Sequence, residues 1–149
     1  MGRSTSTTRL AGVVGLLEAA KADFEGGLLF NLKALTEAEI LGDFLEQAEV
    51  LLAGGYFGPA ASLVGAVLED TLRKISDAAK IPYPAKTKID GLNVALAKAT
   101  IYNALTQKQI TAFADIRNNA DHGHFGKFKQ TDVEDMLKWV RRFASEHLK

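Results

Sequence analysis

The stretch PAASLVGAVLEDTLRKI, residues 59–75, decides the fold class of this chain. Its apolar residues recur every three or four positions and so line one face of a helix, because an α-helix turns once in 3.6 residues. Pro59 suits the first turn of a helix, where its missing N–H group leaves no hydrogen bond unmade. We expect this helix to run to about Ala79, before Pro82 and Pro84. Its expected inner face consists of Ala60, Leu63, Val64, Val67, Leu68, Leu72 and Ile75.

The segment before this helix shows the same period. Residues 1–8 are rich in Ser and Thr and are expected to form a flexible tail. A first helix is expected from Leu10 to about Gly26-Gly27, followed by a short apolar connection over residues 28–35. The next helix is expected to begin at Thr36.

Thr36 and Glu39 form the pattern Thr-x-x-Glu, in which the two side chains bond free backbone N–H groups at the start of a helix. The helix that this capping box opens is expected to end at Gly54-Gly55. Tyr56-Phe57-Gly58-Pro59 then reads as the start of the decisive helix, packing against the preceding turn.

Three further helices are expected after the decisive one. A short helix covers residues 88–99, and a longer one runs from Thr106, in a box with Gln109, to His122, with Gly123 as its C-terminal cap. The last begins at the box formed by Thr131 and Glu134, and its Trp139 is expected to pack against other helices or a partner chain. No segment shows the alternation typical of a strand. The sequence therefore predicts an all-α, up-and-down bundle of about five helices in a single domain, residues 9–149.

Composition excludes several classes of function. The 149 residues contain no cysteine, which excludes disulfides, thiolate chemistry and zinc sites of the cysteine type. Three histidines leave little for another metal site, so we expect no metal and no cofactor. No apolar run approaches the roughly 20 residues that cross a bilayer, and no signal peptide is recognised. We therefore expect a cytoplasmic protein with no membrane partner.

The charge is zero overall but unevenly distributed. Residues 1–74 hold 6 Lys/Arg against 10 Asp/Glu, a net charge of −4, and residues 75–149 hold 12 against 8, a net charge of +4. A basic half is weak support for a nucleic-acid partner, because phosphates are bound by Lys and Arg.

The basic half contains the segment Arg117-Asn118-Asn119-Ala120-Asp121-His122, which is the one place that looks built for chemistry. Asn118 and His122 are four residues apart and so share one helix face. Arg117 is about 140° from His122 around an ideal helix. The long Arg side chain can nevertheless reach around, and His122 stands at the helix end, where the backbone can depart from helical geometry.

This motif resembles the signature of the HEPN superfamily, whose domains are bundles of four or five helices. The signature is an Arg, four to six residues, and a His, often with Asn directly after the Arg. Arg117, Asn118 and His122 match it, and the following Asp-His-Gly run and final helix are similar to prokaryotic stand-alone and restriction- or defence-associated members. The resemblance covers roughly residues 45–147.

The resemblance implies a metal-independent endoribonuclease that acts as a homodimer, with two motifs facing each other across one RNA-binding cleft. It also implies a toxin–antitoxin or phage-defence context, and hence an antitoxin or defence-system partner protein. His122 would be the general acid or base, Arg117 would stabilise the phosphoryl transition state, and Asn118 would orient them. The products would carry a 2′,3′-cyclic phosphate and a 5′-hydroxyl. His124, Lys127 and Lys129 are further candidate contacts for RNA.

Each of these residues also has a plain structural interpretation. His122 is favoured at a helix C-terminus by the helix dipole, and Arg117 is spaced for an ion pair with Asp121. Asn118, His124 and the two lysines can be solvated surface. The alternative function is accordingly a non-catalytic helical module that dimerises and binds RNA, a nucleotide or a partner protein. A structural bundle within a larger enzyme is a third interpretation.

Overall fold

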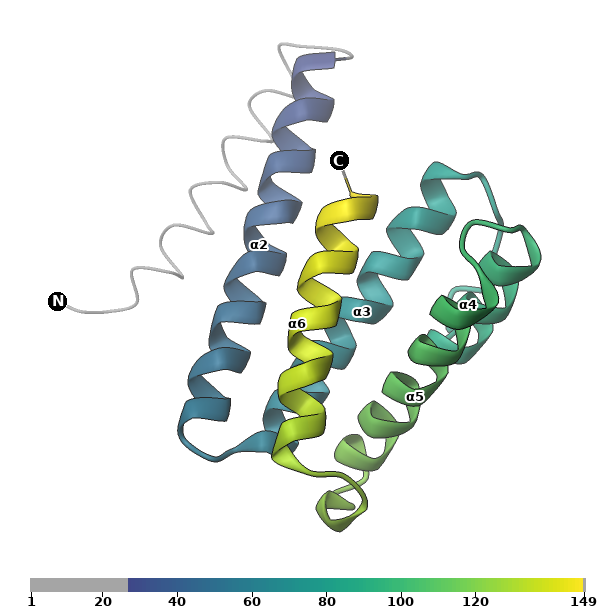
Figure 1. Ribbon diagram of the computed structural model, residues 1–149. Helices are drawn as coiled ribbons and strands as arrows, with labels where there is room; N and C mark the ends of the chain where they lie inside the picture. The colour runs from purple at the N-terminus through teal and green to yellow at the C-terminus, as the bar shows by residue number, and fades with distance from the viewer. Residues whose placement is uncertain (1–26, 149) are drawn as a thin grey trace, which may run out of the picture. The chain divides into compact units, whose positions relative to one another are not determined.

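The computed structural model describes residues 27–148, and their side chains from residue 39 onward. This part of the chain forms five α-helices, one short 3₁₀-helix and no strand (Figure 1), which confirms the predicted all-α class. The α-helices are α2 (Gly27–Ala53), α3 (Phe57–Ala78), α4 (Ile89–Lys98), α5 (Ala104–Asp121) and α6 (Gln130–His147), and the 3₁₀-helix η1 (Phe125–Lys127) lies between α5 and α6. The tail and the first helix that the sequence predicts lie outside the described residues.

The chain divides into two compact units between Asp43 and Phe44, inside α2. In the first unit, the described residues 27–43 are helical throughout. The second unit contains the end of α2, all the later helices and every residue of the predicted site.

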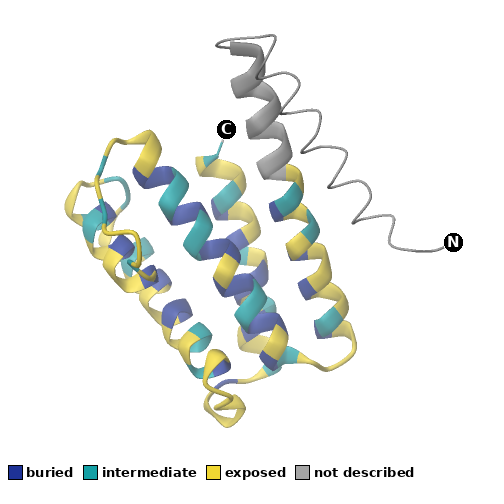
Figure 2. Ribbon diagram, turned by 180° about the vertical axis from the view of Figure 1, so that it is seen from behind, coloured by how far each residue is buried: buried dark blue, intermediate teal, exposed yellow. Residues whose placement is uncertain are grey.

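Helix α3 is the centre of the second unit. It packs against α4, α5 and α6, and α4 packs against α5 (Figure 1). Helices α3, α5 and α6 run alternately in opposite directions, as expected for an up-and-down bundle. Buried residues form the inward faces of these helices (Figure 2). The predicted inner face of α3 is buried at every position except Leu63, which is half-buried.

Trp139 has the packing role that its place on an amphipathic helix predicts. Its half-buried indole stacks on Phe143 one turn further along α6, with ring centroids 4.7 Å apart, and contacts Phe113 of α5 at 5.2 Å. Aromatic contacts of this kind add to the free energy gained from burying the rings. Trp139 is the only tryptophan, so its fluorescence reports on the α5–α6 contact.

The predicted start of the helix at Thr36 is wrong. Helix α2 is continuous from Gly27 to Ala53, so Thr36 lies inside it and residues 28–35 are helix instead of a connection. These eight residues contain no Gly or Pro, and the Leu, Lys and Ala among them have high helix propensity. A Thr-x-x-Glu pattern therefore marks a helix start only where the preceding residues cannot continue the helix.

The predicted capping boxes of α5 and α6 are wrong as well. Helix α5 begins at Ala104, and the side chain of Asn103 caps it by accepting the Thr106 N–H at 2.9 Å. Asn is a better N-cap than Thr, which explains the earlier start. Helix α6 begins at Gln130, and Asp132 accepts the Lys129 N–H at 2.8 Å.

In the part of the chain that the structure describes, no helix combines the length and the apolarity that a bilayer crossing requires.

Candidate functional site

Arg117 lies at the interface between α3 and α5, with only 17% of its side chain exposed. Its Nη1 donates a hydrogen bond of 2.6 Å to Oε2 of Glu69 on α3. Its Nε lies 2.7 Å from Oδ2 of Asp121, four residues further along α5. This second contact is an ion pair without the geometry of a hydrogen bond. The predicted pairing of Arg117 with Asp121 is thus present, and Glu69 is an additional partner from another helix.

Both carboxylates have further partners on or near α3. Ser62 donates its hydroxyl to Asp121 at 2.6 Å, and Arg73 pairs with Glu69 at 2.8 Å. Arg73 also donates to the carbonyl of Thr87 in the loop before α4. We refer to Ser62, Glu69, Arg73, Arg117 and Asp121 as the α3–α5 network. Two positive and two negative side chains make its formal charge zero.

Gly65 allows Arg117 to enter this interface. A Cβ atom at Gly65 would lie 2.1 Å from Cγ and 2.7 Å from Cβ of Arg117, which is far inside van der Waals contact. Residues 62, 65, 69 and 73 follow one another at spacings of three and four and so form one stripe along α3. The stripe faces α5 and receives the Arg117 side chain.

The network keeps Arg117 charged. Burial by itself lowers the pKa of the guanidinium, but the hydrogen bond and charge of Glu69, with a further contribution from Asp121, raise it more. Arg117 is therefore a cation whose Nη2 makes no hydrogen bond to the described residues.

The end of α5 has the backbone geometry that the sequence predicts. His122 is the C-cap and Gly123 has a φ of +73°, a left-handed conformation that glycine adopts without strain. The Gly123 N–H donates to the Ala120 carbonyl at 3.0 Å and the His124 N–H to the Asn119 carbonyl at 2.7 Å. These two bonds form a Schellman motif, which ends the helix and satisfies its last carbonyls.

The Schellman motif places two imidazoles beside each other. His122 and His124 are both exposed, and their ring centroids are 6.0 Å apart with a tilt of 31°. Asn118 is exposed one turn earlier on α5, and its carbonyl accepts the His122 N–H. The Asn119 side chain instead donates to the carbonyl of Asp115.

The ion pair with Asp121 brings the Arg117 guanidinium toward the end of α5. Asp121, the residue with which the guanidinium is paired, directly precedes His122 in the sequence. The spacing on an ideal helix leaves the side chains of Arg117 and His122 on different faces, and the Arg117 side chain is directed to Glu69 and Asp121. No hydrogen bond joins Arg117 to His122 or Asn118 within the described residues.

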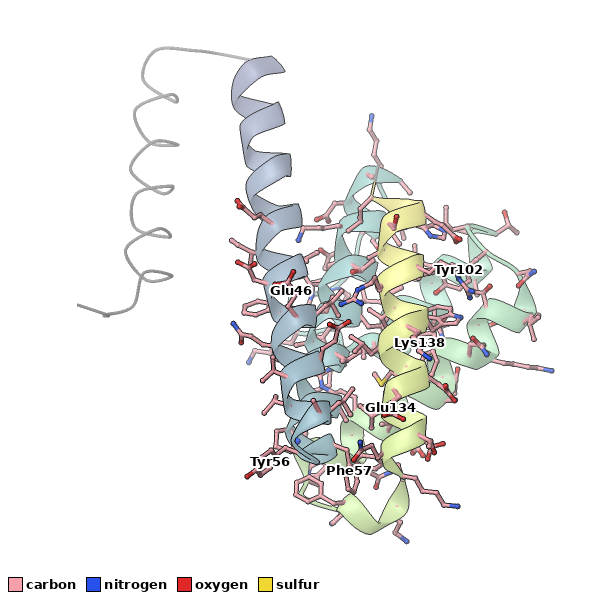
Figure 3. The ribbon with its side chains drawn as sticks, turned by 60° about the vertical axis from the view of Figure 1, so that its left-hand side comes forward. Glu46, Tyr56, Phe57, Tyr102, Glu134 and Lys138 are labelled. Carbon is pink, nitrogen blue, oxygen red and sulfur yellow. The ribbon has the colours of Figure 1, made fainter. Side chains whose placement is uncertain are left out.

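A basic loop with aromatic side chains follows the two histidines. Lys127 and Lys129 are exposed, and residues 122–129 contain no acidic side chain. Phe125 is 43% exposed and contacts the buried Phe128 edge to face. The neighbouring start of α3 carries Tyr56, which points away from the helices and is 63% exposed (Figure 3).

Sequence reasoning missed Ser62, Gly65 and Glu69. One signal for them exists in the sequence: Ser62, Gly65 and Glu69 are small or polar residues that recur at helical spacing within α3. Such a stripe indicates a close approach by another helix, but it does not identify Arg117 as the side chain that fills it.

Among the described residues, no group of three or more His, Cys, Asp or Glu side chains is placed so that it could hold a metal ion. The chain has no match among the family models, curated proteins and solved structures with which it was compared. The chemistry available at the end of α5 is therefore inferred from its residues: two imidazoles for proton transfer, an oriented guanidinium, and two lysines for anion binding.

Proposed function

We propose that this protein is a metal-independent endoribonuclease that cleaves RNA by attack of its own 2′-hydroxyl, with His122 as a proton-transfer group. One observation carries the proposal: the Arg117 guanidinium, oriented by Glu69, is paired with Asp121, the residue that precedes His122 in the sequence, and the His122 imidazole is exposed. A fixed cation and a free imidazole at one helix end are the groups that this reaction requires.

The reaction needs proton transfer at two oxygens. The 2′-oxygen loses its proton as it bonds to phosphorus, and the 5′-oxygen gains a proton as its bond to phosphorus breaks. Imidazole does this work near neutral pH, because its ordinary pKa is about 6.5. The products are a 2′,3′-cyclic phosphate and a 5′-hydroxyl.

Arg117 has the second role in the proposal. Its Nη1 is held by Glu69, which leaves Nη2 as the donor for a phosphate oxygen. Because the α3–α5 network is neutral overall, the network alone attracts an RNA backbone weakly. Lys127 and Lys129, exposed in the loop that follows, supply the additional positive charge. Asn118 presents its amide on the same side of α5 as His122 and orients the bound phosphate.

The resemblance to HEPN ribonucleases extends the proposal to partners. RNA is the substrate, a second copy of the chain completes the cleft, and an antitoxin or another defence-system protein controls the activity. The cleft would be formed by the ends of two α5 helices.

A second candidate function is favoured by the same contacts. Glu69 and Asp121 compensate the charge of Arg117, and this pairing joins α3 to α5 without any ligand. In that case Arg117 is a structural side chain and the protein is a non-catalytic helical module that binds RNA, a nucleotide or a protein.

Incubation of the purified protein with a mixed RNA pool in EDTA separates the two functions. The ribonuclease cuts the pool, and His122→Ala lowers the rate by about 10²- to 10⁴-fold, the usual contribution of a general acid or base. Arg117→Ala also lowers it. His147→Ala and Arg142→Ala are matched controls, because both residues are exposed and lie at the far end of α6, and they retain the wild-type rate.

RNA that stays intact with a folded wild-type protein contradicts the ribonuclease proposal. Circular dichroism and Trp139 fluorescence show whether each variant is folded. Loss of cleavage is attributed to the missing Arg117 or His122 side chain only where both signals of the variant match those of the wild type.

A further inference from the structure

The imidazole of His124 is as available as that of His122. Among the described residues, neither ring makes a hydrogen bond or an ion pair, and both are exposed. His147 differs, because its Nδ1 lies 3.0 Å from the carbonyl of Phe143 and its ring packs on that side chain. The end of α5 thus holds two unengaged imidazoles.

The backbone of His124 is fixed on both sides although it belongs to a connection. Its N–H bonds the Asn119 carbonyl in the Schellman motif, and its carbonyl accepts the Lys127 N–H of η1 at 3.2 Å. Within η1, the ring of Phe125 fills the space above Gly58, where an added Cβ would lie 2.5 Å from it. The position of His124 relative to His122 is therefore set by helix α5, by η1 and by the start of α3.

The separation of the two rings suits one phosphodiester group. An imidazole nitrogen acts on a proton when it lies within roughly 2.6–3.2 Å of the oxygen concerned. Rings with centroids 6.0 Å apart are too far apart to bond each other and can each approach a different oxygen of the same phosphate. Such an arrangement supplies one base and one acid.

We infer that His124 is the second proton-transfer group of the site, so that each chain carries both a base and an acid. The inference rests on the proposed ribonuclease function and deepens it. One imidazole takes the proton of the 2′-hydroxyl as the bond from the 2′-oxygen to phosphorus forms. The other, protonated, gives its proton to the 5′-oxygen as the bond from phosphorus to that oxygen breaks. Proton and bond changes balance without a metal or another reactant.

The charged groups around the pair are few. Arg117 and Asp121 lie on α5, Lys127 on η1 and Lys129 at the start of α6, while residues 57–68 of α3 carry no charge.

The first test measures the cleavage rate against pH for the wild type, His122→Ala and His124→Ala. A base and an acid that are both needed give the wild type a bell-shaped profile. Each variant is expected to lose about 10²- to 10⁴-fold in kcat and one limb of the bell. His124→Gln tests the role further, because it keeps a polar side chain but cannot transfer protons, and it is expected to be as slow as His124→Ala.

The second test uses RNA with sulfur in place of the 5′-bridging oxygen, a leaving group that needs no proton. Whichever of the two Ala variants lacks the acid is expected to recover toward the wild-type rate on this substrate, and the other is not. A merely structural contribution of His124 predicts no recovery for His124→Ala and no lost limb in its pH profile.

A third test asks whether both imidazoles act within one chain. Mixing His122→Ala with His124→Ala restores no cleavage if each site uses its own pair. Restored cleavage shows that the base and the acid come from different chains and overturns the inference. So does a His124→Ala variant with the wild-type rate and an unchanged bell-shaped profile. If the wild type cuts no RNA, the proposed function itself fails. If the wild type cuts RNA and needs only His122, the proposed function stands and the inference on His124 fails.

Discussion

Gly65 of α3 and Arg117 of α5 occupy complementary space, because Cγ of Arg117 lies 2.1 Å from the point where a Cβ on residue 65 would stand. The absence of a side chain at Gly65 therefore allows the Arg117 side chain to be buried between the two helices. This pair links the helix that decides the fold to the helix that carries the predicted motif.

Substituting Gly65→Ala is expected to expel or distort the Arg117 side chain. Overpacking of this kind costs about 1–3 kcal/mol, and the better helix propensity of Ala returns up to about 1 kcal/mol. The free energy of unfolding, measured with urea, should therefore fall by roughly 1–2 kcal/mol. Gly126→Ala is the control, since nothing lies within 4 Å of its added Cβ. Equal stability of the wild type and Gly65→Ala would show that the helices are not packed as closely as described.

Removing the carboxylate of Glu69 leaves the Arg117 charge partly buried without its closest partner. Glu69→Gln is expected to lower the free energy of unfolding by about 3 kcal/mol, the lower end for buried pairs, because both side chains keep some exposure. A double-mutant cycle with Arg117→Gln should give a coupling energy of about 1–3 kcal/mol. Arg142→Gln is the control: its pair with Glu146 is exposed, and its loss should change stability by less than about 0.5 kcal/mol. Additive effects of the two network substitutions would refute the pairing.

Gly123 is needed for its left-handed backbone. Gly123→Ala is expected to cost about 1–2 kcal/mol, because a Cβ disfavours a φ of +73°. Gly123→Asn should cost less, since Asn tolerates this conformation better than Ala. Because the residue lies between the two histidines, the cleavage rate should fall in the same order, Ala below Asn below the wild type. Identical rates for all three proteins would mean that the Schellman motif does not position the imidazoles.

The side chain of Tyr102 makes the free energy of unfolding depend on pH in the alkaline range. Its hydroxyl donates to Oδ1 of Asn93 at 2.6 Å, and burial raises the pKa of Tyr102. The folded protein therefore keeps a proton that the unfolded chain releases above pH 10. By linkage, the free energy of unfolding falls as the pH rises above 10, by at most about 1.4 kcal/mol per pH unit.

Tyr102→Phe should show a shallower alkaline decline and lose about 1 kcal/mol at neutral pH with its hydrogen bond. Urea unfolding between pH 8 and 11 measures both effects. Tyr56→Phe, at an exposed position, should leave the curve unchanged. If the free energy of unfolding of Tyr102→Phe falls as steeply with pH as that of the wild type, the alkaline loss of stability is due to other groups.

Much of the fold could be predicted from the sequence, because it depends on local periodicity. The inner face of α3 and the cap at Gly123 follow from the spacing of apolar residues and from the conformational freedom of glycine. The predicted start at Thr36 was wrong because a capping pattern is a local signal, and an uninterrupted run of good helix formers overrides it. Asn103 was overlooked for a similar reason, as Thr106 offered a competing cap.

The contacts of the candidate site could be predicted only in part. The pair Arg117–Asp121 lies on one helix at a spacing that sequence shows directly. The pair Arg117–Glu69 joins residues on different helices, and only the packing of α3 against α5 brings them together. The same holds for Ser62 and Asp121. Tertiary packing therefore decides whether Arg117 is a free cation or a bound one, and periodicity carries no information on that point.

End-group analysis of a cleaved RNA oligonucleotide in EDTA tests the central claim most directly. Cleavage by the 2′-hydroxyl, with His122 transferring a proton, predicts fragments that end in a 2′,3′-cyclic phosphate and begin with a 5′-hydroxyl. The same incubation with His122→Ala should yield neither. Intact oligonucleotide with folded wild-type protein, or fragments with a 5′-phosphate and a 3′-hydroxyl, would contradict the claim.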